Sequence, residues 1–196
     1  MLIGSLLGDG HVEYNGPLCR VRFDHSIKQK EYVQWKHGVF SPLAGKLVER
    51  KVFDRRTEKT YEKVRFNTLT LGCFNPYGEI FYSGRKKIVP LNIPELLSSP
   101  LALAVWYLDD GALRKDCAAF RLHTNSYTLE EVELLQETLL VNFHLNSTIH
   151  RQGGGFLLHI GAKNCVTDWS RKVLPYDKTF CSLDNANHAI KILLTV

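Results

Sequence analysis

The sequence predicts an α+β protein made of two similar units, each running helix, strand, strand, helix, strand, strand, helix. Two observations support this fold class. An apolar run that ends in Asp-Gly occurs twice, at Leu2–Gly10 and Leu103–Gly111, and each copy is followed by an alternating stretch and then by a helical pattern. We expect two units, residues 1–97 and residues 98–196.

The strands follow each apolar run, which we expect to be a buried helix ended by its glycine. Residues of alternating polarity, Arg20–His25 in the first unit and Phe120–Asn125 in the second, predict the first pair of strands. The later strands are expected within Arg65–Leu71 and Phe156–Ile160, where the alternation is less regular. We expect the strands of each unit to form an antiparallel sheet.

The second helix of each unit is expected at Glu31–Phe40 and at Leu129–Phe143. The start of the later one carries a strong signal, because Thr128 is a good N-cap and Glu131, three residues on, completes a capping box. Ser98–Pro100, preceded by Pro90 and Pro94, is expected to mark the linker between the units, because proline clusters interrupt both helix and ladder.

The charge is unevenly distributed between the two halves. The first 100 residues contain 16 Lys and Arg against 10 Asp and Glu, whereas the remainder contains 9 against 10. Much of the basic excess lies in Lys46–Arg65, for which a polyanion is a natural partner because bound phosphates release counterions. On charge alone, a solvated surface hairpin is the alternative.

The composition, 44% hydrophobic and 23% charged, is that of a globular protein and excludes collagen-like and disordered classes. Apolar runs fall far short of the roughly 20 residues that span a bilayer, and no leader pattern precedes the first motif, so we expect an intracellular protein without a membrane partner. The five cysteines form no CxxC pair, which argues against a zinc ribbon or a disulfide framework.

The two aspartates before glycine, Asp9 and Asp110, stand where a carboxylate faces the negative end of a helix dipole. A divalent cation would compensate for this, because hard cations prefer carboxylate and carbonyl oxygens. If the two apolar helices pack together, the aspartates meet at the foot of the pair. Metals held there could promote phosphodiester hydrolysis.

The paired runs resemble the two signature motifs of LAGLIDADG homing endonucleases in their single-chain, two-motif form. Trp106–Gly111 is similar to the subgroup typified by the yeast mitochondrial intron endonuclease. The likeness extends over nearly the whole chain and includes Phe40–Leu43, Lys86–Pro90 and Tyr127–Glu133.

The resemblance implies a pseudo-twofold monomer whose motif helices form an interface and whose saddle-shaped sheets cover DNA. It implies that Asp9 and Asp110 bind catalytic Mg2+, with Mn2+ as a substitute, and that Gly8 and Asp109 border the same metal site, Asp109 as a neighbour. Gly4 is one of the small residues expected to let the helices approach closely.

A basic residue in each half completes the implied site by polarising the water network. Lys87 occupies the matching place in the first half. In the second half we choose Lys178, and Lys172 is the alternative because the spacing of Lys178 to the late proline departs from the family pattern.

Base recognition is expected from outward polar side chains of the strands, because a two-stranded ribbon fits the major groove. The sequence does not fix the register, and a slip of one residue would reverse every face. The candidates are Arg20, Arg22, Lys51, Arg55, Arg56, Lys59, Lys63, Arg114, Arg121, His123, Arg151 and Gln152.

These features predict a sequence-specific, metal-dependent endonuclease that cuts double-stranded DNA at a long asymmetric site as a monomer. The alternatives are an RNA-binding intron maturase of the same fold and a non-cleaving DNA-binding regulator. Retention of both Asp9 and Asp110 favours the enzyme over the regulator. The compartment remains open between an organelle, mitochondrion or chloroplast, and a bacterial cytoplasm.

Overall fold

The structure of the protein is a computed structural model, and it describes residues 1–113 and 119–161. These residues form two compact units. Unit 1 contains residues 1–8, 79–113 and 119–161, and unit 2 contains residues 9–78. The division falls directly after Gly8, so the boundary at residue 97 remains a prediction about the sequence repeat.

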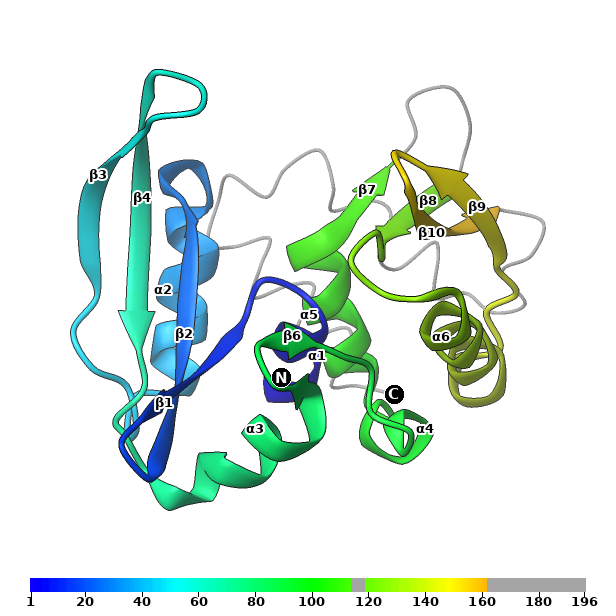
Figure 1. Ribbon diagram of the computed structural model, residues 1–196, viewed down its shortest axis with the longest axis horizontal. Helices are drawn as coiled ribbons and strands as arrows, with labels where there is room; N and C mark the ends of the chain where they lie inside the picture. Colours follow the sequence, from blue (N-terminus) through cyan, green and yellow to red (C-terminus); the bar gives the residue numbers. More distant parts are fainter. Residues whose placement is uncertain (114–118, 162–196) are drawn as a thin grey trace. The chain divides into compact units, whose positions relative to one another are not determined.

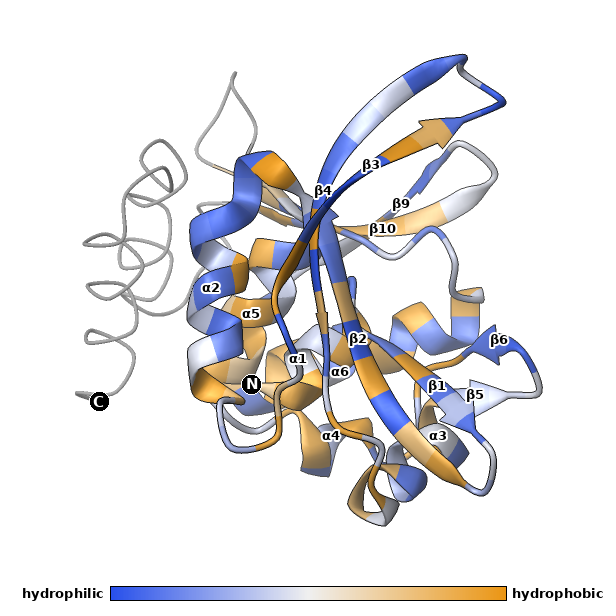
Figure 2. Cartoon of the chain, turned by 90° about the vertical axis from the view of Figure 1, so that its left-hand side faces the viewer, coloured by the Kyte–Doolittle hydropathy of each residue, from blue (hydrophilic) through white to orange (hydrophobic). Residues whose placement is uncertain are grey.

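Unit 2 is a four-stranded antiparallel sheet in the order β1-β2-β4-β3, with α2 along one face (Figure 1). Strand β2 alternates between buried residues such as Val21 and Phe23 and half-buried polar residues such as Arg22, a pattern visible as coloured bands in Figure 2. Phe23 stacks on Phe66 at 4.6 Å between ring centroids, and the Lys36 ammonium of α2 lies over the Phe23 ring. The elements are β1 (His11–Asn15), β2 (Leu18–Ser26), α2 (Lys30–Val39), β3 (Val48–Asp54) and β4 (Lys59–Asn67), with η1 (Ile27–Gln29), η2 (Gly72–Phe74) and α3 (Asn75–Phe81).

Unit 1 contains the second four-stranded antiparallel sheet, in the order β7-β8-β10-β9, and a two-stranded β5-β6 ribbon. Helix α6 packs on β10, β9 and α4. Within the described residues, no helix has both the length and the apolar character required to cross a membrane. The elements are α1 (Leu2–Leu7), β5 (Tyr82–Ser83), β6 (Lys86–Lys87), α4 (Ile93–Leu96), α5 (Pro100–Asp110), β7 (Gly111–Leu113), β8 (Ala119–His123), α6 (Leu129–Phe143), β9 (Thr148–Gln152) and β10 (Gly155–Gly161).

The predicted fold class and the repeat of helix, strands, helix and strands are confirmed, since the two sheets share one connectivity. Helix α6 has the predicted bounds, and α2 begins and ends one residue earlier than predicted. The capping box is present: Thr128 Oγ1 accepts from the Glu131 amide, and the Glu131 carboxylate accepts from the Thr128 amide at 2.7 Å.

The predicted linker is wrong in one respect, because two of its three prolines lie in the first turns of helices. Pro94 lies in the first turn of α4 and Pro100 is the first residue of α5. A first-turn residue needs no amide donor, so proline is favourable at this place. Strand β4 also ends earlier than the alternation to Leu71 suggested: the Thr68 hydroxyl accepts from the Val21 amide at 2.9 Å, replacing a backbone partner of the ladder.

The motif helices α1 and α5 pack together within unit 1, backbone against backbone. A Cβ atom on Gly4 would lie 1.9 Å from the carbonyl oxygen of Ala102, so only glycine fits this position. Trp106 is fully buried, and the buried Tyr107 contacts Phe120 edge to face at 5.3 Å, so both aromatic residues belong to the core.

Gly4→Ala is therefore expected to destabilise the protein by about 3 kcal/mol, because overpacking against rigid backbone costs at least the upper part of the usual range. Urea unfolding followed by circular dichroism measures the change. Gly38→Ala is the matched control, since Gly38 lies exposed in α2 with no heavy atom within 4 Å of the added Cβ. That control should stabilise by about 0.5–1 kcal/mol, and equal effects at the two sites would contradict the tight contact.

Candidate active site and nucleic-acid interface

The C-terminal end of α1 is held by two side chains of unit 1. The Tyr127 hydroxyl donates to the Leu7 carbonyl oxygen at 2.9 Å, and the Lys87 ammonium donates to the Gly8 carbonyl oxygen at 2.6 Å. The last carbonyl groups of a helix have no partner within the helix, so these bonds satisfy acceptors that would otherwise need water. They fix the backbone that leads directly into Asp9.

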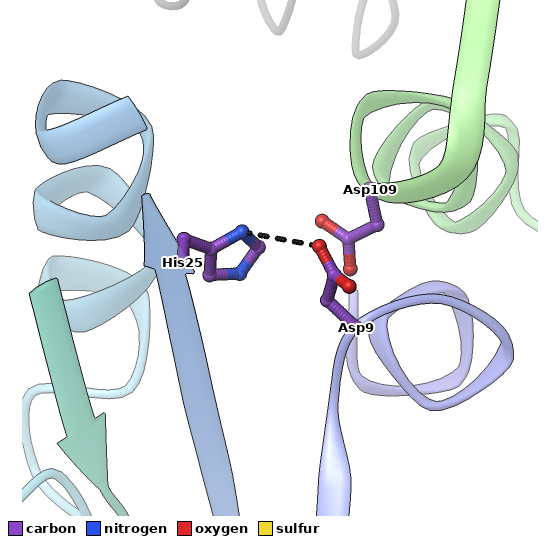
Figure 3. A group of neighbouring side chains, drawn as sticks. All are labelled: Asp9, His25 and Asp109. Atoms are coloured by element: carbon purple, nitrogen blue, oxygen red, sulfur yellow. Dashed lines mark ion pairs between the residues drawn. The ribbon is translucent and has the colours of Figure 1, made fainter. Parts of the chain in front are cut away.

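The end of α5 lies against the same point. A Cβ on Gly8 would lie 2.4 Å from the Asp109 Cβ, so the two segments are in contact where the motif helices end. Asp9 follows Gly8 through one peptide bond, which places its Cα about 3.8 Å further along the chain. Asp109 and Asp110 are the last two residues of α5, and Figure 3 shows Asp109 on this helix end.

Asp110 influences the buried tyrosine that caps α1. Burial raises the pKa of the Tyr127 hydroxyl well above its usual range, and the negative charge of Asp110 raises it further. The hydroxyl therefore remains a donor to Leu7 throughout the neutral range. An acidic motif residue and the cap of the other motif helix are thus electrostatically linked.

Asp9, the first residue of unit 2, lies beside a histidine of strand β2. Its Oδ2 is 3.3 Å from His25 Nδ1, as drawn in Figure 3. The His25 side chain is fully buried, whereas 43% of the Asp9 side chain is exposed. Asp9 is therefore partly exposed to solvent while its carboxylate contacts a buried imidazole.

One face of the unit 2 sheet combines most of the charged side chains predicted to contact nucleic acid. The register places Arg22 opposite Asn67, Asp24 opposite Arg65, and Arg50 opposite Lys63, all on the face turned away from the apolar core. Arg20 lies on the same face of β2, and Lys59 begins β4. Arg55 and Arg56 lie in the exposed β3–β4 turn.

Lys51 departs from this group. It alternates with Arg50 along β3 and therefore lies on the opposite face, where it pairs with Glu62 at 3.3 Å. Arg50 and Arg65, which are not among the sequence candidates, occupy the face that Lys51 was expected to share. The register decides this point, and the sequence alone does not contain it.

Two carboxylates of this face, Glu13 and Asp24, each pair with two cations. We term these two acids the carboxylate clamps. Glu13 pairs with Arg20 at 2.9 Å and with Arg22. Asp24 pairs with Arg50 and, at 3.8 Å, with Lys63. The bonds to Arg20, Arg22 and Arg50 are charge-assisted hydrogen bonds, which restrict the rotamers of long side chains.

A pocket of about 310 Å³ opens on this face, lined by Arg20, Lys46, Arg50, Arg65 and Asn67, with others. The Asn67 Oδ1 is buried and has no hydrogen-bond partner in the part of the chain that the structure describes. Arginine and asparagine side chains match the major-groove edges of guanine and adenine respectively. The pocket thus offers base-recognising groups.

The unit 1 sheet places its candidates on both faces. Arg121 lies opposite His159 in the register, and His123 and Gln152 belong to the same face by alternation. Arg151 lies on the other face, with its guanidinium over the Phe156 ring at 5.9 Å. Arg114, Lys178 and its competitor Lys172 lie outside the described residues.

A profile of the LAGLIDADG DNA endonuclease family matches residues 1–167. The chain belongs to this family. The match includes both motifs, so the resemblance of the two Asp-Gly runs is confirmed.

Relatives of this family member carry two kinds of name. The cytochrome b mRNA maturase bI2 of Debaryomyces hansenii is 33% identical over 158 residues, which cover 78% of this chain and 59% of that protein. The DNA endonuclease I-ChuI of Chlamydomonas applanata is 30% identical over 165 residues, covering 78% of this chain and 75% of the relative. The chain thus spans little more than half the length of the maturase.

The fold is that of solved family structures. The homing endonuclease I-WcaI, bound to its DNA recognition sequence, matches with a TM-score of 0.76 at 23% identity. The match covers 83% of this chain and 74% of the I-WcaI chain. The endonuclease I-DmoI, in complex with nicked target DNA in the presence of Mn, matches with a TM-score of 0.51 at 16% identity. At these identities the likeness concerns the fold.

Several residues of this LAGLIDADG protein escape sequence reasoning. His25 and Tyr127 act through contacts with residues 16 and 120 positions away, and no local pattern marks such pairs. Arg50 and Arg65 were hidden by the unknown register. The alternation of β2, in which His25 follows the buried parity of Phe23, was the available signal for a buried histidine.

Tyr127→Phe tests the cap of α1. Loss of the donor leaves the buried Leu7 carbonyl unsatisfied and should lower the free energy of unfolding by about 1–3 kcal/mol. Because folding raises the Tyr127 pKa above its ordinary value of about 10, the stability of the wild-type protein should fall as pH rises beyond that value. The Phe variant should lack this component.

Chemical unfolding between neutral pH and about pH 11 measures both effects. Tyr61→Phe, at a 43% exposed tyrosine of β4, is the control and should follow the wild-type curve. Identical pH dependence of the Tyr127→Phe variant and the wild-type protein would refute the assigned role of the hydroxyl.

Proposed function

We propose that this protein is a sequence-specific, divalent-metal-dependent endonuclease that hydrolyses phosphodiester bonds of double-stranded DNA at a long asymmetric site. The proposal is carried by the geometry at the motif ends. Helices α1 and α5 pack so closely that Gly8 touches Asp109. Asp9 follows Gly8 in the sequence, and Asp110 follows Asp109. Family membership over residues 1–167 supports the same activity.

The donor set fits a hard divalent cation. Asp9 and Asp110 offer carboxylate oxygens, and the residue before each of them in the sequence, Gly8 and Asp109, offers a further oxygen donor. Such ligands suit Mg2+, and Mn2+ accepts the same oxygens. A carboxylate at a helix C-terminus gains nothing from the dipole, so a cation offsets its cost. When bound, the ion would supply charge stabilisation at the phosphate and lower the pKa of coordinated water.

The chain's own residues prepare this site. Lys87 holds the Gly8 carbonyl and brings a positive charge to the peptide before Asp9. We assign it as the basic residue of the first half, and Lys178 as that of the second half, with Lys172 as its competitor. Tyr127 keeps α1 in place by its bond to Leu7.

The basic face of unit 2 is proposed to bind the DNA half-site of the first motif, and Arg121, His123 and Gln152 the other half. I-WcaI is bound to its recognition sequence in its structure, which supports DNA as the partner. Because the two sheets carry different polar residues, we propose a monomer on a non-palindromic target.

An intron maturase is the second candidate function, favoured by the name of the 33% identical Debaryomyces relative, a cytochrome b mRNA maturase. In that case intron RNA would be a partner, and an organelle would be the compartment. The retained motif aspartates favour a nuclease over a non-cleaving DNA-binding regulator.

Asp9→Asn and Asp110→Asn are each expected to abolish cleavage in Mg2+ while DNA affinity stays the same or rises slightly, because a charge repelling phosphate is lost. The target is first selected from a randomised DNA library by sequencing the ends that the wild-type protein cuts. Gel analysis then measures cutting, and fluorescence anisotropy measures binding. Glu95→Gln, an exposed carboxylate of α4, is the control. Full cutting by both aspartate variants would sink the assignment.

Arg65→Gln should weaken binding and relax the preference at one base pair, at a cost of about 1–3 kcal/mol for a lost guanine contact. Lys51→Gln is the matched control: the same sheet loses a cation, but from the opposite face. Repeating the library selection with both variants decides the matter. A larger effect at Lys51 would show that the other face of the sheet meets the DNA.

A further inference from the structure

His25 is a buried histidine whose polar edge is directed at a motif aspartate. Its side chain has no exposed surface, and its Nδ1 lies 3.3 Å from Asp9 Oδ2 (Figure 3). Burial of an imidazole costs free energy unless its nitrogens are engaged, so this position in β2 requires a reason beyond packing. The contact with Asp9 supplies one.

Two further residues of unit 2 contact the imidazole. Gln29 Oε1 lies 3.2 Å from the same Nδ1, and the Tyr32 ring meets the imidazole edge to face at 5.7 Å. Tyr32 in turn stacks on Trp35, and the Lys36 ammonium lies 4.5 Å from the centroid of the Tyr32 ring. Residues of η1 and α2 thus contact the imidazole that β2 supplies.

The two neighbours of Nδ1 determine where its proton resides. Both are oxygen acceptors, the Asp9 carboxylate and the Gln29 side-chain carbonyl, so the neutral ring carries its hydrogen on Nδ1 and donates it. Supporting hydrogen bonds of this type orient the carboxylates that ligate metals.

The corresponding place in the second repeat is filled differently. Ser26 and Ser126 follow the two strands at equivalent places, which pairs His25 with Asn125. The Asn125 amide donates to the Gln152 backbone carbonyl at 2.9 Å. This donor therefore supports a hairpin, whereas the donor of the first repeat supports a motif aspartate.

We propose that His25 is a positioning residue: its Nδ1–H fixes the orientation in which the Asp9 carboxylate meets a divalent cation. The inference rests on the proposed function only in taking Asp9 as a metal ligand. It gives the first motif a built-in support within unit 2.

The first test uses cleavage of the selected target at varied Mg2+. His25→Leu keeps the volume but removes the donor, and should raise the Mg2+ concentration for half-maximal cleavage by about 10- to 100-fold. His25→Asn places an amide donor near the Nδ1 position and should restore most of the loss. DNA affinity should be unchanged in both variants. His37→Leu, which removes a histidine bonded to the Gly45 carbonyl in the same unit, is the control for loss of a structural contact and should not alter the Mg2+ requirement.

A second test needs neither activity nor metal. Long-range nitrogen–proton NMR of the free protein labelled with 15N-histidine, in slightly alkaline solution, should show the His25 hydrogen on Nδ1. Asp9→Ala should move that proton upfield. A hydrogen on Nε2, or a shift unaffected by Asp9→Ala, would overturn the proposal, as would an Asn variant as impaired as the Leu variant. If the wild-type protein cuts no DNA, the proposed function fails, and the NMR result still decides the role of His25.

Discussion

Direct backbone contact between α1 and α5 is the constraint on which the rest of the structure depends. Helix α1 has only six residues, too few to be stable by itself, and it is placed by the fit of Gly4 against the Ala102 carbonyl. Tyr127 and Lys87 then satisfy the carbonyl groups at its end. The end of α1, where the motif begins its Gly-Asp step, is therefore built on a contact that tolerates no side chain.

The fold was largely predictable because its signals are local. The two Asp-Gly runs indicated the repeat, and the capping box predicted the first residue of α6 correctly. The candidate site was predictable only where a motif carries it. The register between β3 and β4 decides which member of the Arg50–Lys51 pair lies on the face turned away from the core. That register is a property of two strands together. The prolines misled for a related reason, since a first turn accepts what a helix interior rejects.

The two sheets show how a shared frame accommodates different chemistry. Their strand orders correspond element by element, yet the first presents carboxylate clamps among arginines, and the second presents His150 stacked on His159 at 5.0 Å. Buried positions preserve the frame because core volume is constrained, whereas the outward positions of a strand can change without moving the backbone. Divergence of the polar faces is therefore the inexpensive route to an asymmetric surface.

The carboxylate clamps have a consequence for how such a surface changes over time. Glu13 serves Arg20 and Arg22 together, and Asp24 serves Arg50 and Lys63. A single codon change at either acid releases two cations at once. On the proposed role of this face, preferences at adjacent base pairs would therefore be inherited as blocks. Drift toward a new target, and its redesign in the laboratory, would then proceed by exchange of a whole clamp with its two cations, since a lone substitution would leave the remaining partner aimed at the old sequence.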